Sequence, residues 1–466
     1  MSTSASDGTP APIRAALVAI QLPGVDDAAF SASVAELHRL GRTLGVEVVA
    51  TVTQRRPSLH RAAVLGTGKL AVLRALAGQT DADDVELDDE SEVDAGDDAD
   101  APAGALGRDD DEQSAGGPMV PIQAVLVDHE ISPSQARNLE RATGVEVLDR
   151  TAVILEIFRR HARSRAAKAQ VEIVRLAYLV PRLREQGRAA GQDRQRGGIG
   201  GKGAGESSLE LDRRKIRDRI AELTRELHGL EEEQRTQRAR RRDMNRMALV
   251  GYTNAGKSTL MRALTGSEVY VADKLFATLD TTVRALSPET HPRILVSDTV
   301  GFIDKLPHGL VASFKSTLDE ALEAGLLAQV VDASDPNFER QLQVTTEVLA
   351  EIGAGDVPRL LVFNKIDRVG DAAAEARATA ELKTRWPEGV VLSARRPDDV
   401  ARLRAHLIAF FGRELVEGEV HVPYDRQNKR GEIFANCEVL GESYDESGVI
   451  FRVRAHPALL ERLRAA

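Results

Sequence analysis

Short apolar runs alternate with amphipathic stretches through the first 150 residues of the chain. The runs are rich in Val, Leu and Ile, as buried strands are, and the stretches between them repeat their apolar residues every three or four positions, as helices do. Alternation of this kind predicts a small parallel α/β domain at 12–150. The expected strands are 16–20, 46–50, 124–127 and 145–148, and the expected helices are 28–44 and 133–143.

A strongly acidic insert interrupts this pattern at 80–117. Residues 81–112 contain 16 Asp and Glu against a single Arg, with Gly and Ala between them. Such a segment cannot bury enough apolar surface to fold, so we expect it to be disordered. Residues 1–11 are small and polar, and we expect them to form a disordered tail.

Helical periodicity then runs to about residue 242. The pattern predicts two long helices, 151–185 and 207–242, in an antiparallel hairpin that occupies 151–245. The apolar residues of the second helix step by four and three, which is a heptad seam. The seam consists of Ile216, Ile220, Leu223, Leu227 and Leu230.

The loop between these two helices, 188–206, is longer than a hairpin needs. Six of the ten residues at 197–206 are Gly, and Arg194 and Arg196 precede them. A hairpin turn takes only about two to five residues. A flexible basic tip fits a crowded anionic groove such as folded RNA, although glycine-rich linkers without a partner are also common.

Strand-like runs return after residue 245 and predict a second α/β domain at 246–415. A small C-terminal domain follows at 416–466, where we expect an additional contact surface. The strands expected in the larger domain are 247–250, 293–297, 329–332, 360–363 and 390–392, with a helix at 259–264. Those expected in the C-terminal domain are 431–440 and 449–454, with a closing helix at 459–463.

Composition limits the class of protein. Cys437 is the only cysteine, which excludes an intrachain disulfide and a zinc site built on paired cysteines. The sequence has neither an apolar run of about 18 residues nor an apolar core near Met1, so it predicts no membrane span and no signal peptide. We therefore expect a cytoplasmic protein, which we take to be monomeric.

Charge is distributed unevenly along the chain. The net charge is −10, but residues 150–202 contain 13 Lys and Arg against four Asp and Glu. A basic segment of this kind is typical of nucleic-acid binding, and equally of a solvated helix face.

The segment 251–258, Gly-Tyr-Thr-Asn-Ala-Gly-Lys-Ser, gives the strongest chemical signal. It lies between an expected strand and an expected helix, which is the context of a phosphate-binding loop. Backbone N–H groups and the helix N-terminus can bind phosphate oxygens there. Lys257 would place its charge on the β- and γ-phosphates, and Ser258 would offer a hydroxyl to Mg²⁺.

Two later motifs extend this site. Asp298 directly follows the expected strand 293–297 and suits a water-mediated contact with Mg²⁺, and the N–H of Gly301 suits sensing of the γ-phosphate. The tetrapeptide 364–367, Asn-Lys-Ile-Asp, ends another strand. The Asp367 carboxylate can accept two hydrogen bonds from guanine, whereas adenine lacks that donor pair, so the sequence predicts GTP as the ligand.

A second glycine motif, Leu65-Gly66-Thr67-Gly68-Lys69, lies in the first domain. It is short, so we interpret it as a tight turn into a helix rather than as another phosphate site.

Together these motifs resemble the HflX family of bacterial ribosome-associated GTPases. The specific match is 197–214, which includes the glycine-rich tip, Leu209-Glu210 and Asp212-Arg213-Arg214, directly before the GTPase motifs. The segments 276–280 (switch I) and 298–307 also resemble this family. Ala204, Ser207 and Thr281 depart from its usual Pro, Thr and Pro.

The resemblance implies a P-loop GTPase with Mg²⁺ as cofactor. Ser258 and Thr278 would hold Mg²⁺, Asp298 would contact it through water, and Lys257, Thr278 and Gly301 are the candidate catalytic residues. The other candidate nucleotide contacts are Gly251, Tyr252, Thr253, Asn254, Ala255, Gly256, Phe276, Ala277, Leu279, Asp280, Thr299, Val300, Asn364, Lys365, Ile366, Asp367, Ser393, Ala394 and Arg395.

The resemblance also implies partners, namely the large ribosomal subunit with its RNA and the 70S ribosome. A factor of this kind would split stalled or idle ribosomes. A nucleotide-gated switch on a protein complex and a GTPase for ribosome assembly or RNA modification remain as alternatives.

Two residues bear on the reaction. Phe302 follows Gly301 where many small GTPases have a water-orienting glutamine. Asn254 stands where similar GTPases use an asparagine to hold K⁺, although asparagine also stabilises loops by simple hydrogen bonds.

Overall fold

The computed structural model describes residues 12–79, 120–195, 204–239, 244–267, 275–276, 278–279, 281–305, 315–426 and 428–465. The expected tail, the acidic insert and the tip residues 197–203 lie outside these ranges. The chain divides into two compact units, 1–157 with 178–215, and 158–177 with 216–466. The boundaries that the sequence suggests at 150, 245 and 415 stay predictions. None of the described helices combines the length and the apolar content needed to cross a membrane.

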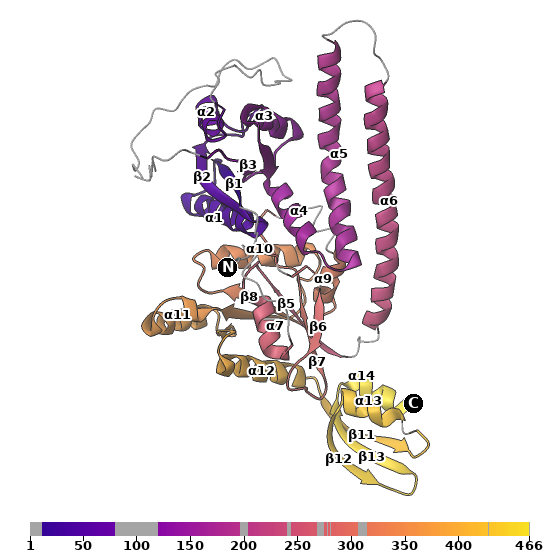
Figure 1. The fold of residues 1–466 in the computed structure, drawn as a ribbon. Helices are drawn as coiled ribbons and strands as arrows, with labels where there is room; N and C mark the ends of the chain where they lie inside the picture. The colour runs from indigo at the N-terminus through magenta and orange to yellow at the C-terminus, as the bar shows by residue number, and fades with distance from the viewer. Residues whose placement is uncertain are drawn as a thin grey trace, which may run out of the picture. The chain divides into compact units, whose positions relative to one another are not determined.

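The first unit is built on a parallel sheet of strand order β2-β1-β3-β4, as the alternating pattern predicts (Figure 1). Alternate residues of β1, including Val18 and Ile20, pack with apolar residues of α2 and α3 on one face. Leu126 of β3 lies on the other face, close to Gly41 of α1. The elements are β1 (Ile13–Gln21), α1 (Asp27–Leu44), β2 (Val46–Arg55), α2 (Thr67–Leu76), β3 (Ala124–Val127), α3 (Pro133–Thr143) and β4 (Glu146–Asp149).

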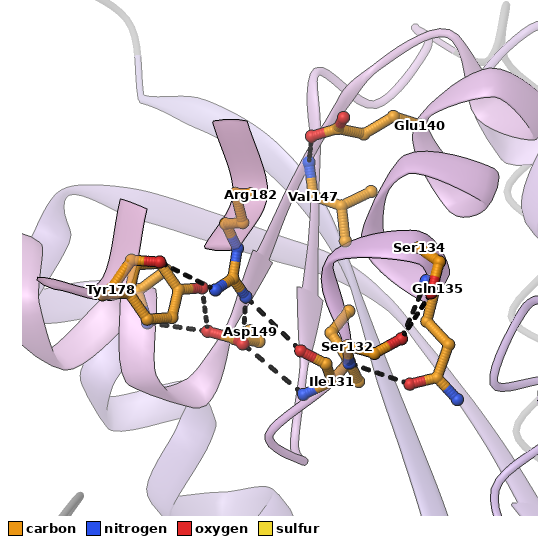
Figure 2. A network of polar contacts seen from close by, with 10 residues as sticks. Ile131, Ser132, Ser134, Gln135, Glu140, Val147, Asp149, Tyr178 and Arg182 are labelled. Atoms are coloured by element: carbon orange, nitrogen blue, oxygen red, sulfur yellow. Dashed lines mark hydrogen bonds and ion pairs between the residues drawn. The ribbon is translucent and has the colours of Figure 1, made fainter. Parts of the chain in front are cut away.

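A buried carboxylate at the end of β4 joins several parts of this unit (Figure 2). Asp149 accepts hydrogen bonds from the Tyr178 hydroxyl at 2.7 Å, from the Arg182 guanidinium at 2.8 Å and from the N–H of Ala152 at 2.8 Å. The Arg182 guanidinium also lies 3.5 Å from the centre of the Tyr178 ring. Burial raises the pKa of the Tyr178 phenol, so its hydroxyl stays a donor.

A second buried network of ion pairs lies in the same unit and is centred on Arg150. Arg150 is 3% exposed and donates to Asp128 at 2.7 Å and to Glu36.

The region in which the sequence predicts two long helices contains three helices in the described part of the structure. These are α4 (Arg150–His161), α5 (Arg165–Gln195) and α6 (Ala204–Ala239). The expectation of one helix over 151–185 is wrong, because Ser164 begins a new helix by accepting a hydrogen bond from the N–H of Ala167 at 3.1 Å. The expected loop 188–206 is also too long, since Ala, Gln and Arg extend α5 to Gln195 and α6 starts at Ala204.

Three of the five predicted seam residues form a core between α5 and α6. Ile216, Ile220 and Leu223 of α6 pack with Ile173 and Leu176 of α5 within the second unit. A half-buried apolar stripe on each helix is therefore covered by the other.

The larger sheet of the second unit has the order β10-β9-β8-β5-β7-β6, parallel except for β6. Apolar residues of α7 and α12, including Leu260, Leu264 and Leu403, form its main core with β5, β7 and β8. The elements are β5 (Asn245–Gly251), α7 (Lys257–Thr265), β6 (Thr282–Ala285), β7 (Ile294–Asp298), α9 (Lys315–Leu322), β8 (Leu326–Asp332), α10 (Phe338–Glu351), β9 (Arg359–Asn364), η1 (Ile366–Arg368), α11 (Ala372–Arg385), β10 (Val390–Val391) and α12 (Pro397–Gly412).

The C-terminal part differs from the expectation. Residues 431–436, predicted as strand, belong to helix α13, because Ile433 and Cys437 are buried at helical spacing while Phe434 is 42% exposed. The antiparallel sheet has the order β11-β13-β12, and its first strand was not expected. The elements are β11 (Val416–Pro423), α13 (Asn428–Asn436), β12 (Glu438–Tyr444), β13 (Gly448–Ala455) and α14 (Pro457–Ala465).

Candidate nucleotide-binding site

The glycine-rich segment lies between β5 and α7, in the context that its sequence predicts. Gly251 has a φ of 147°, and a Cβ there would lie 2.2 Å from the carbonyl oxygen of Val330 on the neighbouring strand. A side chain cannot fit, so the tight turn after β5 requires glycine at this position. The turn leads into α7, whose first residue is Lys257.

Lys257 folds back over the loop. Its Nζ donates to the carbonyl oxygens of Gly251 and Tyr252, at 3.0 and 2.9 Å. The side chain is buried, and burial lowers the pKa of Lys257 to about 8, although the Asp298 carboxylate acts in the opposite direction. Phosphate oxygens of a bound nucleotide can replace these carbonyl oxygens as hydrogen-bond acceptors for the buried ammonium.

The segment after β7 is hydrogen-bonded to this loop. Phe302 donates its N–H to Gly251 at 3.1 Å and accepts from the N–H of Thr253 at 2.7 Å. A Cβ on Gly301 would lie 2.8 Å from Thr253 Cγ2 and 3.0 Å from Lys257 Nζ. The same Cβ would lie 2.9 Å from the backbone Cα of Thr253, so the close approach of this segment to the phosphate loop requires glycine at 301.

Oxygen donors converge beside Lys257. The Ser258 hydroxyl lies 2.8 Å from Thr278 Oγ1 and donates to Asp298 Oδ2 at 2.7 Å. Asp298 is fully buried, and burial raises the pKa of its carboxyl. Within the described residues its other oxygen, Oδ1, is buried without a hydrogen-bond partner.

Asn364 and Lys365 bind the phosphate loop from the neighbouring strand end. Asn364 is 2% exposed, donates to the carbonyl oxygen of Ala255 at 2.9 Å and accepts from the N–H of Ala394 at 2.9 Å. Lys365 donates from Nζ to the carbonyl oxygen of Asn254 at 2.6 Å and to Asp332 at 2.7 Å. These two side chains hold three loops together.

Asp367 lies in the short helix η1, and its half-buried carboxylate accepts no hydrogen bond from the described residues. The loop 393–395 is joined to this region by the hydrogen bond from the N–H of Ala394 to Asn364. The N–H of Arg395 donates to Ser393 Oγ at 3.3 Å. Asp399 supports this loop by accepting from the N–H of Ser393 at 2.8 Å.

Most of the residues predicted to contact the phosphates line one pocket, and a few do not. A pocket is lined by Thr253, Asn254, Gly256, Lys257, Ser258, Thr259, Phe276, Thr278, Thr299 and Gly301. The side chains of Tyr252, Ala255, Leu279, Val300 and Ile366 are buried in the fold instead. Ala277 and Asp280 lie outside the described residues.

Three residues at or around this site were missed by sequence reasoning. Thr259 lines the pocket one residue beyond the motif, and Asp332 and Asp399 support the base-side loops. The position of Asp332 at the end of a buried strand, where parallel sheets place their ligand sites, is a signal that identifies it.

The second glycine motif begins helix α2, with Gly66 as its N-cap residue. The N–H of Gly66 donates to Gln54 Oε1 at 3.0 Å. This fits the interpretation as a turn into a helix.

Three family models match the chain. They are described as GTP-binding GTPase N-terminal (31–92 and 118–159), GTP-binding GTPase Middle Region (161–241) and 50S ribosome-binding GTPase (246–365). The GTPase HflX of Gluconacetobacter diazotrophicus is 55% identical over 450 residues, which cover 97% of either chain. The chain belongs to the HflX GTPase family.

A more distant HflX protein agrees with this assignment. The GTPase HflX of Caldanaerobacter subterraneus is 35% identical over 97% of this chain and 93% of its own. A solved GTP-binding protein from Sulfolobus solfataricus, in complex with GDP, is similar over 85% of this chain and 99% of its own, at 23% identity and a TM-score of 0.41.

Membership of the HflX family makes the chain an enzyme that binds GTP and hydrolyses it to GDP and phosphate. GTPases of this kind typically use Mg²⁺, and the residues present fit that ion. Two hydroxyls and a carboxylate with a buried, unpartnered oxygen form a set of hard oxygen donors, which Mg²⁺ prefers. When bound, the ion would neutralise charge on the β- and γ-phosphates.

Proposed function

We propose that this HflX GTPase binds the large ribosomal subunit and 70S ribosomes and splits ribosomes that are stalled or idle. The observation that carries the proposal is the match of 246–365 to a family of 50S ribosome-binding GTPases. The basic segment 150–202 supports it, because positive charge on helices of this length suits a partner rich in phosphate. Ribosomal RNA is then the main contact, and the cytoplasm is the place of action of a monomeric factor.

The proposed roles of the site residues follow from their positions. Lys257 binds the β- and γ-phosphates, and the N–H of Gly301 contacts the γ-phosphate. Ser258 and Thr278 hold Mg²⁺, with Asp298 behind them through water. Asp367 accepts hydrogen bonds from guanine, in a loop that Asn364 and Lys365 hold against the phosphate loop.

We further propose K⁺ as an accessory ion beside Asn254. Asn254 lines the pocket, has a φ of 61°, and its side-chain amide makes no hydrogen bond within the described residues. The Asn254 side chain is exposed beside the phosphate loop, so its amide oxygen is accessible to an ion. K⁺ would stabilise negative charge that develops during phosphoryl transfer.

Sedimentation in sucrose gradients tests the ribosomal proposal. Purified 70S ribosomes are mixed with the protein and GTP, GDP or a non-hydrolysable GTP analogue. We expect the protein to co-sediment with large subunits and to convert 70S particles into subunits with GTP or the analogue, but not with GDP. Co-sedimentation without splitting would favour an assembly factor, and absence from every ribosomal fraction would favour a switch on a protein complex.

A variant with 197–205 replaced by a short Gly-Ser linker tests the tip. We expect GTP binding to be unchanged and splitting to be lost. Splitting at the rate of the unmodified protein would show that the tip is only a linker.

A further inference from the structure

Two phenylalanines from distant parts of the sequence form a buried pair within the second unit. Phe158 lies near the end of α4 and Phe276 lies in the segment between α7 and β6 that resembles switch I. Their ring centres are 4.5 Å apart with planes at 74°, an edge-to-face arrangement. Phe158 is 0% and Phe276 2% exposed.

The backbone of Phe276 is strained. Its φ is 57°, in the left-handed region, which bulky residues rarely adopt. Such a conformation persists only where the surroundings hold it in place. Phe158 packs edge-on against the Phe276 ring inside the fold, so it is part of the surroundings that keep this ring in place.

Phe276 is close to the reacting groups. It borders the same pocket as Lys257, and Thr278, whose hydroxyl lies 2.8 Å from Ser258 Oγ, follows only two residues later. Two residues span at most about 7 Å, so fixing Phe276 restricts where the Thr278 hydroxyl lies. A core pair placed for stability alone would not need to border the nucleotide pocket.

We propose that Phe158 and Phe276 are positioning residues for GTP hydrolysis. Phe158 holds Phe276 in its strained conformation, and this places Thr278 against Ser258. The proposal rests on the Mg²⁺-binding role proposed above for Thr278. It makes the end of α4 part of the hydrolytic machinery, although α4 contributes no group to the nucleotide pocket in the described residues.

A double-mutant cycle on the full chain tests this coupling. Phe158→Ala, Phe276→Ala and the double variant are compared for kcat with GTP and for affinity toward GDP and a non-hydrolysable GTP analogue. We expect each single change to lower kcat by on the order of 10- to 100-fold, as misplacement of a reacting group does. The double variant should lose no more than either single variant, because both remove the same contact. GDP affinity should stay within about twofold, as the phosphate loop and the base-side loops remain.

Two controls separate positioning from loss of stability. Phe338→Ala removes a comparable ring, which packs edge-on to Phe363 and Trp386 away from the pocket, and should lower Tm without lowering kcat. Phe158→Leu keeps the apolar bulk and should recover part of kcat if the alanine variant is unstable. An unchanged kcat in folded Phe158→Ala, additive losses, or a parallel loss of GDP affinity would overturn the proposal. If Thr278→Ala itself leaves hydrolysis unchanged, the assigned role of Thr278 fails, whatever the phenylalanines do.

Discussion

The side-chain nitrogen of Asn364 lies 2.9 Å from the carbonyl oxygen of Ala255, so the loop expected to read the base is bonded to the loop expected to hold the phosphates. The oxygen of the same amide accepts from Ala394 in a third loop. One buried side chain thus sets the relative position of three ligand-binding segments.

Replacing Asn364 should therefore weaken binding of GTP and GDP alike. In Asn364→Ala, buried backbone groups of Ala255 and Ala394 lose their partners, which destabilises the arrangement of the three loops by about 1–3 kcal/mol. Nucleotide binding must then restore this arrangement, so affinity should fall by up to about 5- to 150-fold. Titration with fluorescent GDP and GTP measures the loss. Asn364→Asp keeps the acceptor for Ala394 but turns a buried carboxylate oxygen toward the carbonyl oxygen of Ala255, so its affinity should fall at least as far. An unchanged affinity in Asn364→Ala would contradict the bridging role.

Asp367→Asn should change which base is preferred. The substitution replaces an acceptor by an amide that also donates, so preference should move from GTP toward xanthosine triphosphate. Competition titrations with both nucleotides measure this shift. Asp371→Asn, a helix-capping position outside the site, should leave the preference unchanged. GTP affinity that is unaltered in Asp367→Asn would mean that this carboxylate does not contact guanine.

Nucleotide affinity should fall at alkaline pH. Burial lowers the pKa of Lys257 to about 8 in the free protein, whereas bound phosphates favour the charged ammonium. Above pH 8 the free protein must take up a proton to bind, so the apparent Kd should rise by up to about tenfold per pH unit. Calorimetry in buffers of different ionisation enthalpy should show this uptake near pH 9 and little at pH 7. Equal proton uptake at both values would contradict the lowered pKa.

Phe302→Ala should leave turnover in place. The Phe302 ring is 2% exposed and cannot orient water by hydrogen bonds. The hydrogen bonds that Phe302 makes with the phosphate loop come from its backbone. We expect kcat within about tenfold of the parent and a stability loss of about 3–5 kcal/mol, as for other buried Phe→Ala changes. Lys257→Ala, in contrast, should abolish hydrolysis. Complete loss of turnover in a folded Phe302→Ala protein would show a direct role for the ring.

Isolated protein should hydrolyse GTP slowly, since no glutamine follows Gly301. Contact with the large subunit should accelerate hydrolysis by ordering the switch segments. In small GTPases, a catalytic group supplied by a partner protein raises kcat by about 10³–10⁵-fold, and we expect a smaller increase here. Phosphate release is measured with and without large subunits, in Na⁺ and in K⁺ buffers. Equal rates in all four conditions would argue against both the ribosomal partner and the K⁺ site.

The phosphate loop could be predicted because its geometry depends on local chemistry. Gly251 and Gly256 both have positive φ, and Lys257 starts the helix. The residue types at these positions therefore determine the local backbone conformation. The parallel strands of the two larger sheets were recognisable for a similar reason, since buried strands such as Leu326–Asp332 are mostly apolar. The antiparallel strand β6 was missed, because it is short and only partly buried.

Long-range partners could not be predicted in this way. Nothing near Phe276 in the sequence indicates that its ring meets Phe158, and Asp332 shows no local sign of its contact with Lys365. The error at 431–436 has another cause, because an apolar run of that length suits a strand and a short helix equally. The four-residue spacing of Ile433 and Cys437 was the signal that favoured the helix.

The buried carboxylate of Asp149 limits how the protein can be dissected. A fragment that stops at residue 150 would keep Asp149 but lose the hydroxyl of Tyr178, the guanidinium of Arg182 and the N–H of Ala152. Breaking a buried ion pair from one side costs about 3–5 kcal/mol, a large share of the stability of a small domain. An expression fragment of the N-terminal sheet should therefore extend beyond Arg182, well into helix α5, if it is to fold in isolation.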